Sequence, residues 1–123
     1  MRKIGWIGAG IMGQPMVIHL LNKGYEVHVY ARHPERVEQA KNAGAILEES
    51  IESLTSNVDV ICTMVGFPSD VKEVYDVIFS CIEAGKTCID FTTSSPKLAK
   101  ELYTKGKELG VHVVDAPVTG GDT

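Results

Sequence analysis

A glycine-rich stretch near the N-terminus constrains the fold of this chain more than any other feature. It reads IGWIGAGIMG and has the spacing Gly-x-Gly-x-x-Gly at Gly8, Gly10 and Gly13. The apolar residues before Gly8 predict a short buried strand over residues 3–8. Because glycine has no Cβ, its backbone can turn tightly and come close to another group. The stretch therefore indicates a turn that brings bare backbone against a ligand or a neighbouring element.

The sequence that follows decides how this motif is interpreted. Residues 14–23 have apolar positions at helical spacing, and residues 25–30 (YEVHVY) are a second predicted strand. A Gly-x-Gly-x-x-Gly between strand and helix, inside a strand–helix–strand unit, is typical of a dinucleotide-binding turn. Gly8 would allow the turn, Gly10 would let a pyrophosphate approach, and Gly13 would bring helix and strand together. The helix N-terminus would favour the anionic diphosphate. A glycine turn that only packs is the alternative.

Strand and helix patterns continue to alternate along the chain. The predicted elements are a helix from Pro34 to about Ala43, a short helix over residues 50–54, a strand over residues 58–65, a helix from Pro68 through Ile78, a strand over residues 86–91, a helix carrying Leu98, Leu102 and Leu109, and a strand over residues 111–115. This order predicts an α/β fold of the Rossmann type: a doubly wound parallel sheet with helices on both faces, in three layers. We find no repeat or linker and expect one domain over residues 1–123.

The end of the second predicted strand bears on which dinucleotide binds. NAD-binding chains usually carry an acidic residue there for the ribose 2′-hydroxyl, whereas this chain reads Ala31-Arg32-His33. An arginine suits a 2′-phosphate, and a charged hydrogen bond contributes about 1.5 to 3 kcal/mol. Arg32 therefore predicts NADP in preference to NAD, with NAD still possible. A solvated surface arginine is the alternative.

Composition excludes other classes of protein. Sixteen acidic and twelve basic residues give a net charge of −4, without a basic run to match a row of phosphates, so we expect no nucleic-acid partner. No apolar run reaches the roughly 18 residues of a membrane-spanning helix. Glycines interrupt the N-terminal apolar run, so we do not interpret it as a signal peptide. Cys62, Cys81 and Cys88 lack zinc-site spacing, which predicts free thiols in the cytoplasm and no metal site.

Four segments together resemble one enzyme family. They are IGWIGAGIMGQPMVIHLLNKGY, CTMVGFPSDVKEVY, DFTTSSP and DAPVTGG. In this order and spacing they resemble the N-terminal cofactor domain of the 3-hydroxyisobutyrate dehydrogenase (β-hydroxyacid dehydrogenase) family, which is related to 6-phosphogluconate dehydrogenase. The resemblance spans nearly the whole chain. It implies an NAD(P)-dependent oxidoreductase that transfers a hydride between the nicotinamide and a short 3-hydroxy acid or its semialdehyde.

The resemblance also implies which residues form the site. The cofactor's diphosphate would contact Gly8, Ala9, Gly10, Ile11, Met12 and Gly13, its adenosine ribose Ala31, Arg32 and His33, its other ribose Met64 and Val65, and its nicotinamide Thr93. The substrate carboxylate would be held by Thr119, Gly120 and Gly121 through a hydroxyl and backbone N–H groups.

Two positions depart from the family pattern. The family often has Met-Leu-Pro after the third long strand, whereas here the proline is displaced to Pro68, which leaves the contacts of that loop open. Thr119 stands where serine is common. Its hydroxyl would still bind the carboxylate, and we expect its additional methyl group to narrow the pocket.

Members of the family carry an essential lysine, the proton donor or acceptor for the alcohol oxygen, downstream of the DAPVTGG-like segment. An all-helical C-terminal domain follows, which closes the site and mediates dimerisation. This chain ends at Thr123. The resemblance thus implies a fragment or truncated form of a two-domain, homo-oligomeric enzyme, without the C-terminal domain and without a catalytic residue. We expect it to bind dinucleotide and to turn over little or nothing.

Other polar residues are interpreted as structural. His19, His28 and His112 are expected to be packed or surface histidines, and Asp90 and Asp115 to cap the turns that follow their strands. Two other functions stay open. One is the cofactor domain of an imine reductase-like relative, with another residue at the lysine position, and the other is a non-catalytic dinucleotide-binding module.

Overall fold

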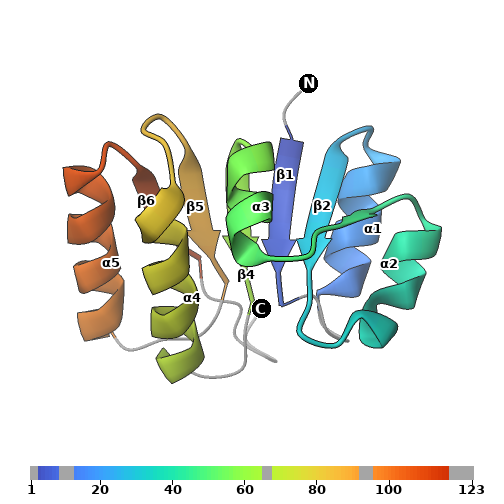
Figure 1. Cartoon of the computed structure of the whole chain (residues 1–123), viewed down its shortest axis with the longest axis horizontal. Helices are drawn as coiled ribbons and strands as arrows, with labels where there is room; N and C mark the ends of the chain where they lie inside the picture. The colour runs from blue at the N-terminus through green and yellow to red at the C-terminus, as the bar shows by residue number, and fades with distance from the viewer. Residues whose placement is uncertain (1–2, 9–12, 65–67, 92–95, 117–123) are drawn as a thin grey trace.

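The structure, a computed structural model, describes residues 3–8, 13–64, 68–91 and 96–116, and its centre is one six-stranded sheet (Figure 1). The strands are β1 (Lys3–Ile7), β2 (Glu26–Tyr30), β3 (Ile46–Leu47), β4 (Val60–Thr63), β5 (Thr87–Asp90) and β6 (His112–Asp115). Every paired strand is parallel, in the spatial order β3-β2-β1-β4-β5-β6. This order is doubly wound and reverses at β1, which confirms the predicted Rossmann-type fold.

Helices connect the strands as the alternating pattern predicts. They are α1 (Gln14–Asn22), the 3-10 helix η1 (Pro34–Val37) that leads into α2 (Glu38–Asn42), α3 (Ile51–Asn57), α4 (Pro68–Cys81) and α5 (Pro96–Glu108). The second predicted helix therefore begins as a 3-10 helix. Gly24, Gly44 and Gly110 follow α1, α2 and α5 and have positive φ values, a conformation in which glycine commonly ends a helix.

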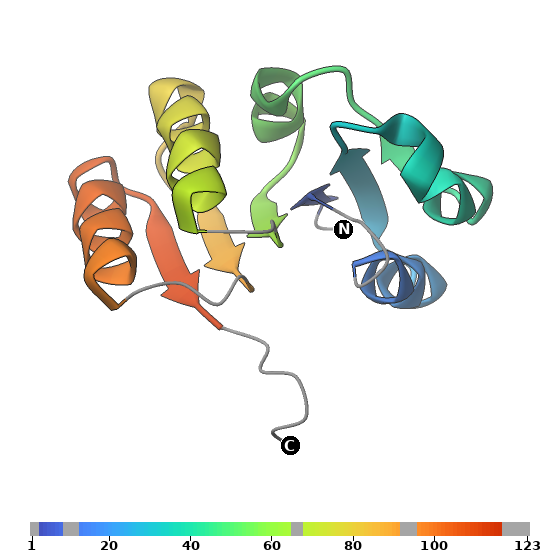
Figure 2. The same cartoon turned by 90° about the horizontal axis from the view of Figure 1, so that it is seen from below.

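The two faces of the sheet carry separate apolar clusters. Trp6 and Cys62 belong to the cluster beneath α1 and α2, and their chain neighbours Ile7 and Ile61 to the cluster beneath α3, α4 and α5. Figures 1 and 2 show the helices on the two sides of the sheet. In the part of the chain that the structure describes, no helix covers the β4–β6 end of the α1 face (Figure 2).

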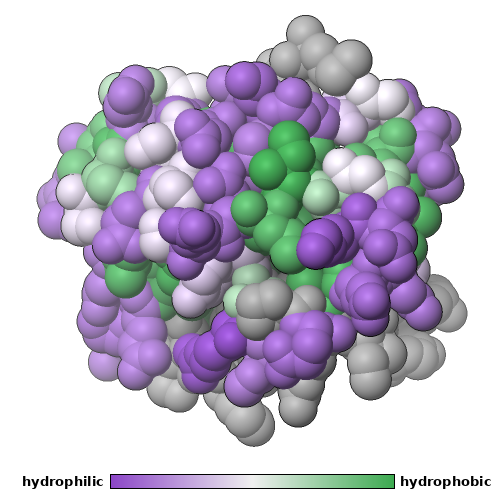
Figure 3. All heavy atoms as spheres, turned by 45° about the vertical axis from the view of Figure 1, so that its right-hand side comes forward, coloured by the Kyte–Doolittle hydropathy of each residue, from purple (hydrophilic) through white to green (hydrophobic). Residues whose placement is uncertain are grey.

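The edge strand β3 was not predicted from the sequence. It has two residues and pairs with β2 through His28↔Ile46 and Val29↔Leu47. Two residues are too few to produce an alternating pattern, so the strand exists only because β2 offers a free edge. Ile46 is 43% exposed on this strand. Figure 3 brings this end of the sheet forward and shows a large apolar patch near the middle of the view, bordered by polar residues, with smaller apolar areas to either side.

Gly5 in β1 allows α3 to lie close to the sheet. A Cβ at this position would be 2.5 Å from Leu54 Cδ2 and 2.9 Å from Val58 Cγ2. Leu54 is fully buried, and α3 contacts both β1 and β2. A larger residue at position 5 would therefore push α3 away from the sheet.

A partly buried polar cluster joins β3 and α3 to β2. Glu48 Oε2 lies 2.6 Å from His28 Nδ1, and Glu26 Oε2 lies 2.6 Å from His28 Nε2. Glu48 also accepts hydrogen bonds from Ser53 Oγ (2.8 Å) and Asn57 Nδ2 (3.0 Å) of α3. Burial raises the pKa of Glu48, but the hydrogen bonds from Ser53, Asn57 and His28 outweigh burial, so this pKa lies below its ordinary value of 4.5. His28 is a packed residue, as expected.

The lowered pKa of Glu48 predicts a loss of stability in acid. Its ionised form stabilises the fold fully above the unfolded-state pKa, near 4.5, and this contribution disappears as the pH falls through the lower folded-state pKa. Glu48→Gln should lower the free energy of unfolding by about 1 to 3 kcal/mol at pH 7 and flatten its decline below about pH 5. Urea unfolding followed by circular dichroism measures this, with the exposed Glu49→Gln as control. A Glu48→Gln curve parallel to wild type in acid would contradict the prediction.

Candidate dinucleotide-binding site

The carboxyl ends of the central strands lie side by side at one edge of the sheet. Ile7 is in register with Tyr30 of β2 and Thr63 of β4, and Thr63 is in register with Asp90 of β5. The arrowheads of β1, β2 and β5 point to this same edge in Figure 1. The residues that follow these strands are therefore neighbours in space, and ligands of doubly wound sheets bind at this edge.

The first glycine of the motif makes the turn out of β1. Gly8 has a φ of +88°, a conformation that L side chains rarely adopt. Its N–H donates to Tyr30 O at 3.1 Å, which ties the end of β1 to the end of β2. Gly13 is buried and is the N-cap of α1, and its carbonyl accepts from Val17 N–H at 3.1 Å. The N-terminus of α1, with its partial positive charge, thus follows directly on the glycine motif.

Gln14, the first residue of α1, was not singled out from the sequence. It is buried, and its Oε1 accepts a hydrogen bond from Ala40 N–H of α2 at 3.1 Å. This bond ties the beginning of α1 to α2, so it supports the helix end beside the glycine turn. The only sequence signal for this role is a polar side chain at the first position of the helix, next to the glycine motif.

The residues after β2 lie at the same edge of the sheet, next to the residues that follow β1. Ala31 is half-buried, and Arg32 and His33 are exposed. His33 Nδ1 lies 3.6 Å from Glu35 Oε1, and both side chains are solvent-exposed. Because Gly8 bonds to Tyr30, the glycine turn and Arg32 come from neighbouring strand ends. The structure therefore brings together these two parts of the predicted cofactor site.

Of the remaining predicted site residues, Met64 lies within the described ranges and the others lie outside them. Met64 is half-buried, and its N–H donates to Ile7 O at 3.0 Å, which places it beside the end of β1. The predicted residues outside the described ranges are Ala9, Gly10, Ile11, Met12, Val65, Thr93, Thr119, Gly120 and Gly121.

An aromatic pair lies at the same edge. The rings of Trp6 and Phe91 are stacked, with centroids 5.5 Å apart and an angle of 17° between the ring planes. Phe91 follows β5, and its N–H donates to Thr63 O at 2.8 Å. Trp6 is 1% exposed, so its fluorescence reports on the ends of β1 and β5 rather than on bulk solvent.

Several other kinds of site lack support in the described residues. Burial raises the pKa of Cys62 and of Cys88 to about 12, so both thiols stay protonated and are poor nucleophiles. All three cysteines are free. Within residues 3–8, 13–64, 68–91 and 96–116, no group of His, Cys, Asp and Glu could hold a metal ion. No helix in these ranges is long and apolar enough to cross a membrane.

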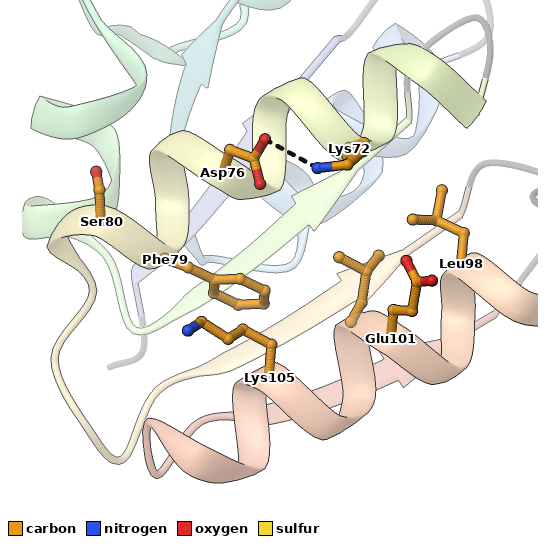
Figure 4. A pocket seen from close by; sticks show the side chains of 8 residues that line it. Lys72, Asp76, Phe79, Ser80, Leu98, Glu101 and Lys105 are labelled. Carbon is orange, nitrogen blue, oxygen red and sulfur yellow. Dashed lines mark hydrogen bonds and ion pairs between the residues drawn. The ribbon is translucent and has the colours of Figure 1, made fainter.

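A groove runs between α4 and α5, with lining residues from both helices (Figure 4). Phe79, Leu98 and Leu102 contribute its apolar lining. On its α4 side, Lys72 Nζ lies 3.3 Å from Asp76 Oδ2, and both side chains are exposed. This is an i,i+4 pair of the kind that stabilises a helix surface, and we assign no ligand to the groove.

Comparison with known proteins identifies the domain. The family model for the NAD binding domain of 6-phosphogluconate dehydrogenase matches residues 3–123. The chain belongs to this family. The predicted family relationship is therefore confirmed, and the chain is an NAD-binding domain of the hydroxyacid dehydrogenase-like oxidoreductases.

Three relatives show how far this NAD-binding domain extends. The uncharacterized oxidoreductase YkwC of Bacillus subtilis is 45% identical over 98% of this chain and 43% of its own length. The 3-hydroxyisobutyrate dehydrogenase of Mycobacterium tuberculosis, solved with L-serine, has a TM-score of 0.91 and 28% identity over 98% of this chain and 42% of its own. The imine reductase of Myxococcus stipitatus, solved with NADP+, has a TM-score of 0.84 and 26% identity over 92% of this chain and 39% of its own. The chain thus spans less than half the length of these proteins.

Replacing Gly8 should separate the turn's role in binding from its backbone strain. Gly8→Ala forces a side chain into a positive-φ conformation, which destabilises the fold by roughly 1 to 2 kcal/mol, and should weaken NADPH binding at least tenfold. Gly24→Ala is the matched control, because Gly24 has a φ of +96° with nothing within 4 Å of the added Cβ, and it lies at the other end of α1. It should lose similar stability and keep its affinity. Calorimetric titration of the two variants measures the difference, and equal losses of affinity would refute it.

Proposed function

We propose that this chain is the cofactor-binding half of an oxidoreductase that prefers NADP and transfers a hydride to or from a short 3-hydroxy acid or its semialdehyde. The observation that carries the proposal is the juxtaposition of the Gly8 turn, the N-terminus of α1 and Arg32 at neighbouring ends of β1 and β2. A helix N-terminus and backbone N–H groups suit a diphosphate, and a guanidinium suits the 2′-phosphate of NADP.

Local geometry would hold the phosphates, because the net charge of the chain is −4 and its overall field is unfavourable to anions. Arg32 is exposed and makes no ion pair among the described residues, so its guanidinium can reach a ligand at the edge. In this proposal residues 8–13 contact the diphosphate, and residues 31–33 surround the adenosine ribose.

The remaining residues of the proposed site lie toward the reacting end. Met64 and Val65 would line the second ribose, and Thr93 would lie beside the nicotinamide. Thr119, Gly120 and Gly121 would hold the substrate carboxylate. When bound, the cofactor supplies or accepts the hydride. The chain's own task is then to orient the substrate so that its hydroxyl-bearing carbon faces the nicotinamide.

The substrate class is supported by the Mycobacterium tuberculosis enzyme, which is named a 3-hydroxyisobutyrate dehydrogenase and was solved with L-serine. L-serine carries a carboxylate and a hydroxyl on carbon 3. Because the chain spans 43% of YkwC, we place the proton-transfer lysine, the helical second domain and the dimer interface in a region that follows this domain in the whole protein. Free cysteines suit a reducing cytoplasm, where we place the enzyme.

Titration of the chain with NADPH and NADH, followed by Trp6 fluorescence, tests the cofactor preference. Wild type should bind NADPH at least tenfold more tightly than NADH. Arg32→Ala should lose about ten- to a hundredfold in NADPH affinity and leave NADH affinity unchanged, since only NADPH carries the 2′-phosphate. Lys23→Ala, an exposed cation at the far end of α1, is the control for nonspecific charge. Equal or tighter binding of NADH by wild type would defeat the NADP preference.

The structural likeness to an imine reductase solved with NADP+ supports a second candidate function. The whole protein, comprising this domain and the region that follows it, should oxidise 3-hydroxyisobutyrate with NADP+, as measured by NADPH absorbance. Reduction of a cyclic imine with NADPH, without oxidation of the hydroxy acid, would support the imine reductase instead. Cofactor binding without either reaction would support a non-catalytic module.

A further inference from the structure

A buried hydrogen-bond network joins β4, β5 and α4 at the carboxyl edge. Thr63 is the last residue of β4, Asp90 is the last residue of β5, and the two are in register. Thr63 Oγ1 donates to Asp90 Oδ1 at 2.9 Å, and Tyr75 Oη of α4 lies 3.1 Å from Thr63 Oγ1. Thr63 and Tyr75 are fully buried, and Asp90 is 2% exposed. Three polar side chains from three elements thus meet out of contact with water.

The order of donors in this network is determined by the groups present. The single hydroxyl proton of Thr63 is directed to Asp90, so Thr63 Oγ1 must accept from Tyr75. Burial, and next the neighbouring Cys88, raise the pKa of Tyr75 well above its ordinary value, so the phenol keeps the proton that it donates. The chain of bonds runs from Tyr75 through Thr63 to Asp90 and holds all three side chains in one arrangement.

The network lies where two segments of the proposed site leave the sheet. Met64 directly follows Thr63, and its N–H donates to Ile7 O at 3.0 Å. Phe91 directly follows Asp90, and its N–H donates to Thr63 O at 2.8 Å. The proposed contacts to the nicotinamide half of the cofactor, Met64, Val65 and Thr93, lie within three residues of Thr63 or Asp90 along the chain. Gly8 and Arg32, by contrast, follow β1 and β2.

We propose that Thr63, Tyr75 and Asp90 are positioning residues for the nicotinamide half of the cofactor. They hold the ends of β4 and β5 at one spacing and orientation, and so set where the following segments start. This inference rests on the proposed function. The adenosine and diphosphate half is held from β1 and β2, outside the network, so it is independent of these three residues.

A network that only stabilises the fold would behave differently. Replacing buried, mutually bonded polar groups by apolar ones of similar shape changes stability by a variable amount and can be nearly neutral. A loss of stability acts on the whole domain and would weaken the binding of all ligands alike. A selective effect on one half of the cofactor distinguishes positioning from general stabilisation.

The test compares NADPH with adenosine 2′,5′-bisphosphate, which has the 2′-phosphate but no nicotinamide half. Calorimetry on Thr63→Val should show at least a tenfold loss of NADPH affinity and no more than a twofold change for the bisphosphate. Thr63→Ser keeps the hydroxyl and should restore NADPH binding. Thr55→Val is the matched control, because Thr55 is a fully buried threonine on α3 whose hydroxyl bonds only locally, to Ile51 O at 2.8 Å. It should leave both affinities unchanged.

Tyr75→Phe removes one hydroxyl at the end of the network and keeps the ring, so it tests the same idea should Thr63→Val fail to fold by circular dichroism. This variant should also lose affinity for NADPH and keep its affinity for the bisphosphate. Equal losses for both ligands, or no loss in either variant, would overturn the positioning role and leave the proposed function intact. Wild type that binds neither ligand would overturn both.

Discussion

The parallel pairing of β1 with β2 on one side and β4 on the other is the constraint on which this structure depends. It sets Ile7, Tyr30 and Thr63 in register, so the chain leaves three adjacent strands at one edge. The hydrogen bonds from Gly8 N–H to Tyr30 O and from Met64 N–H to Ile7 O continue the pairing one residue past β1 and β4. Backbone pairing in the sheet alone therefore brings these segments of the proposed site to one edge.

Close packing of the helices preserves this arrangement. Gly5 lets Leu54 of α3 lie against β1, where a Cβ would come within 2.5 Å of it. Two polar clusters add hydrogen bonds between elements to this packing. One joins Glu48 and His28 beside β3, and the other joins Thr63, Asp90 and Tyr75 at the carboxyl edge. Buried polar groups are costly unless each is bonded, so such clusters specify one arrangement of the elements that carry them.

Much of the fold could be predicted from residue patterns, because local signals agreed with one another. The glycine motif, the buried strand before it and the helical spacing after it all indicated the same unit, and the structure has helices where apolar spacing predicted them, with Gly24, Gly44 and Gly110, all of positive φ, following three of them. The edge strand β3 could not be predicted, since Ile46 and Leu47 are too short a segment to show a period. Neither could the partners of His28 and Thr63, because Glu48 and Asp90 lie 20 and 27 residues away in the chain.

The sequence by itself determined the α/β class, the dinucleotide-type turn and the family, since these depend on short-range patterns of glycine and apolar residues. Only the tertiary structure decided which strand ends are neighbours, so that Gly8 and Arg32 follow adjacent strands, and that Thr63, Tyr75 and Asp90 meet in the core. The physical reason is that strand order and side-chain partners follow from burial and pairing across the sheet. These contacts join residues that no local pattern relates.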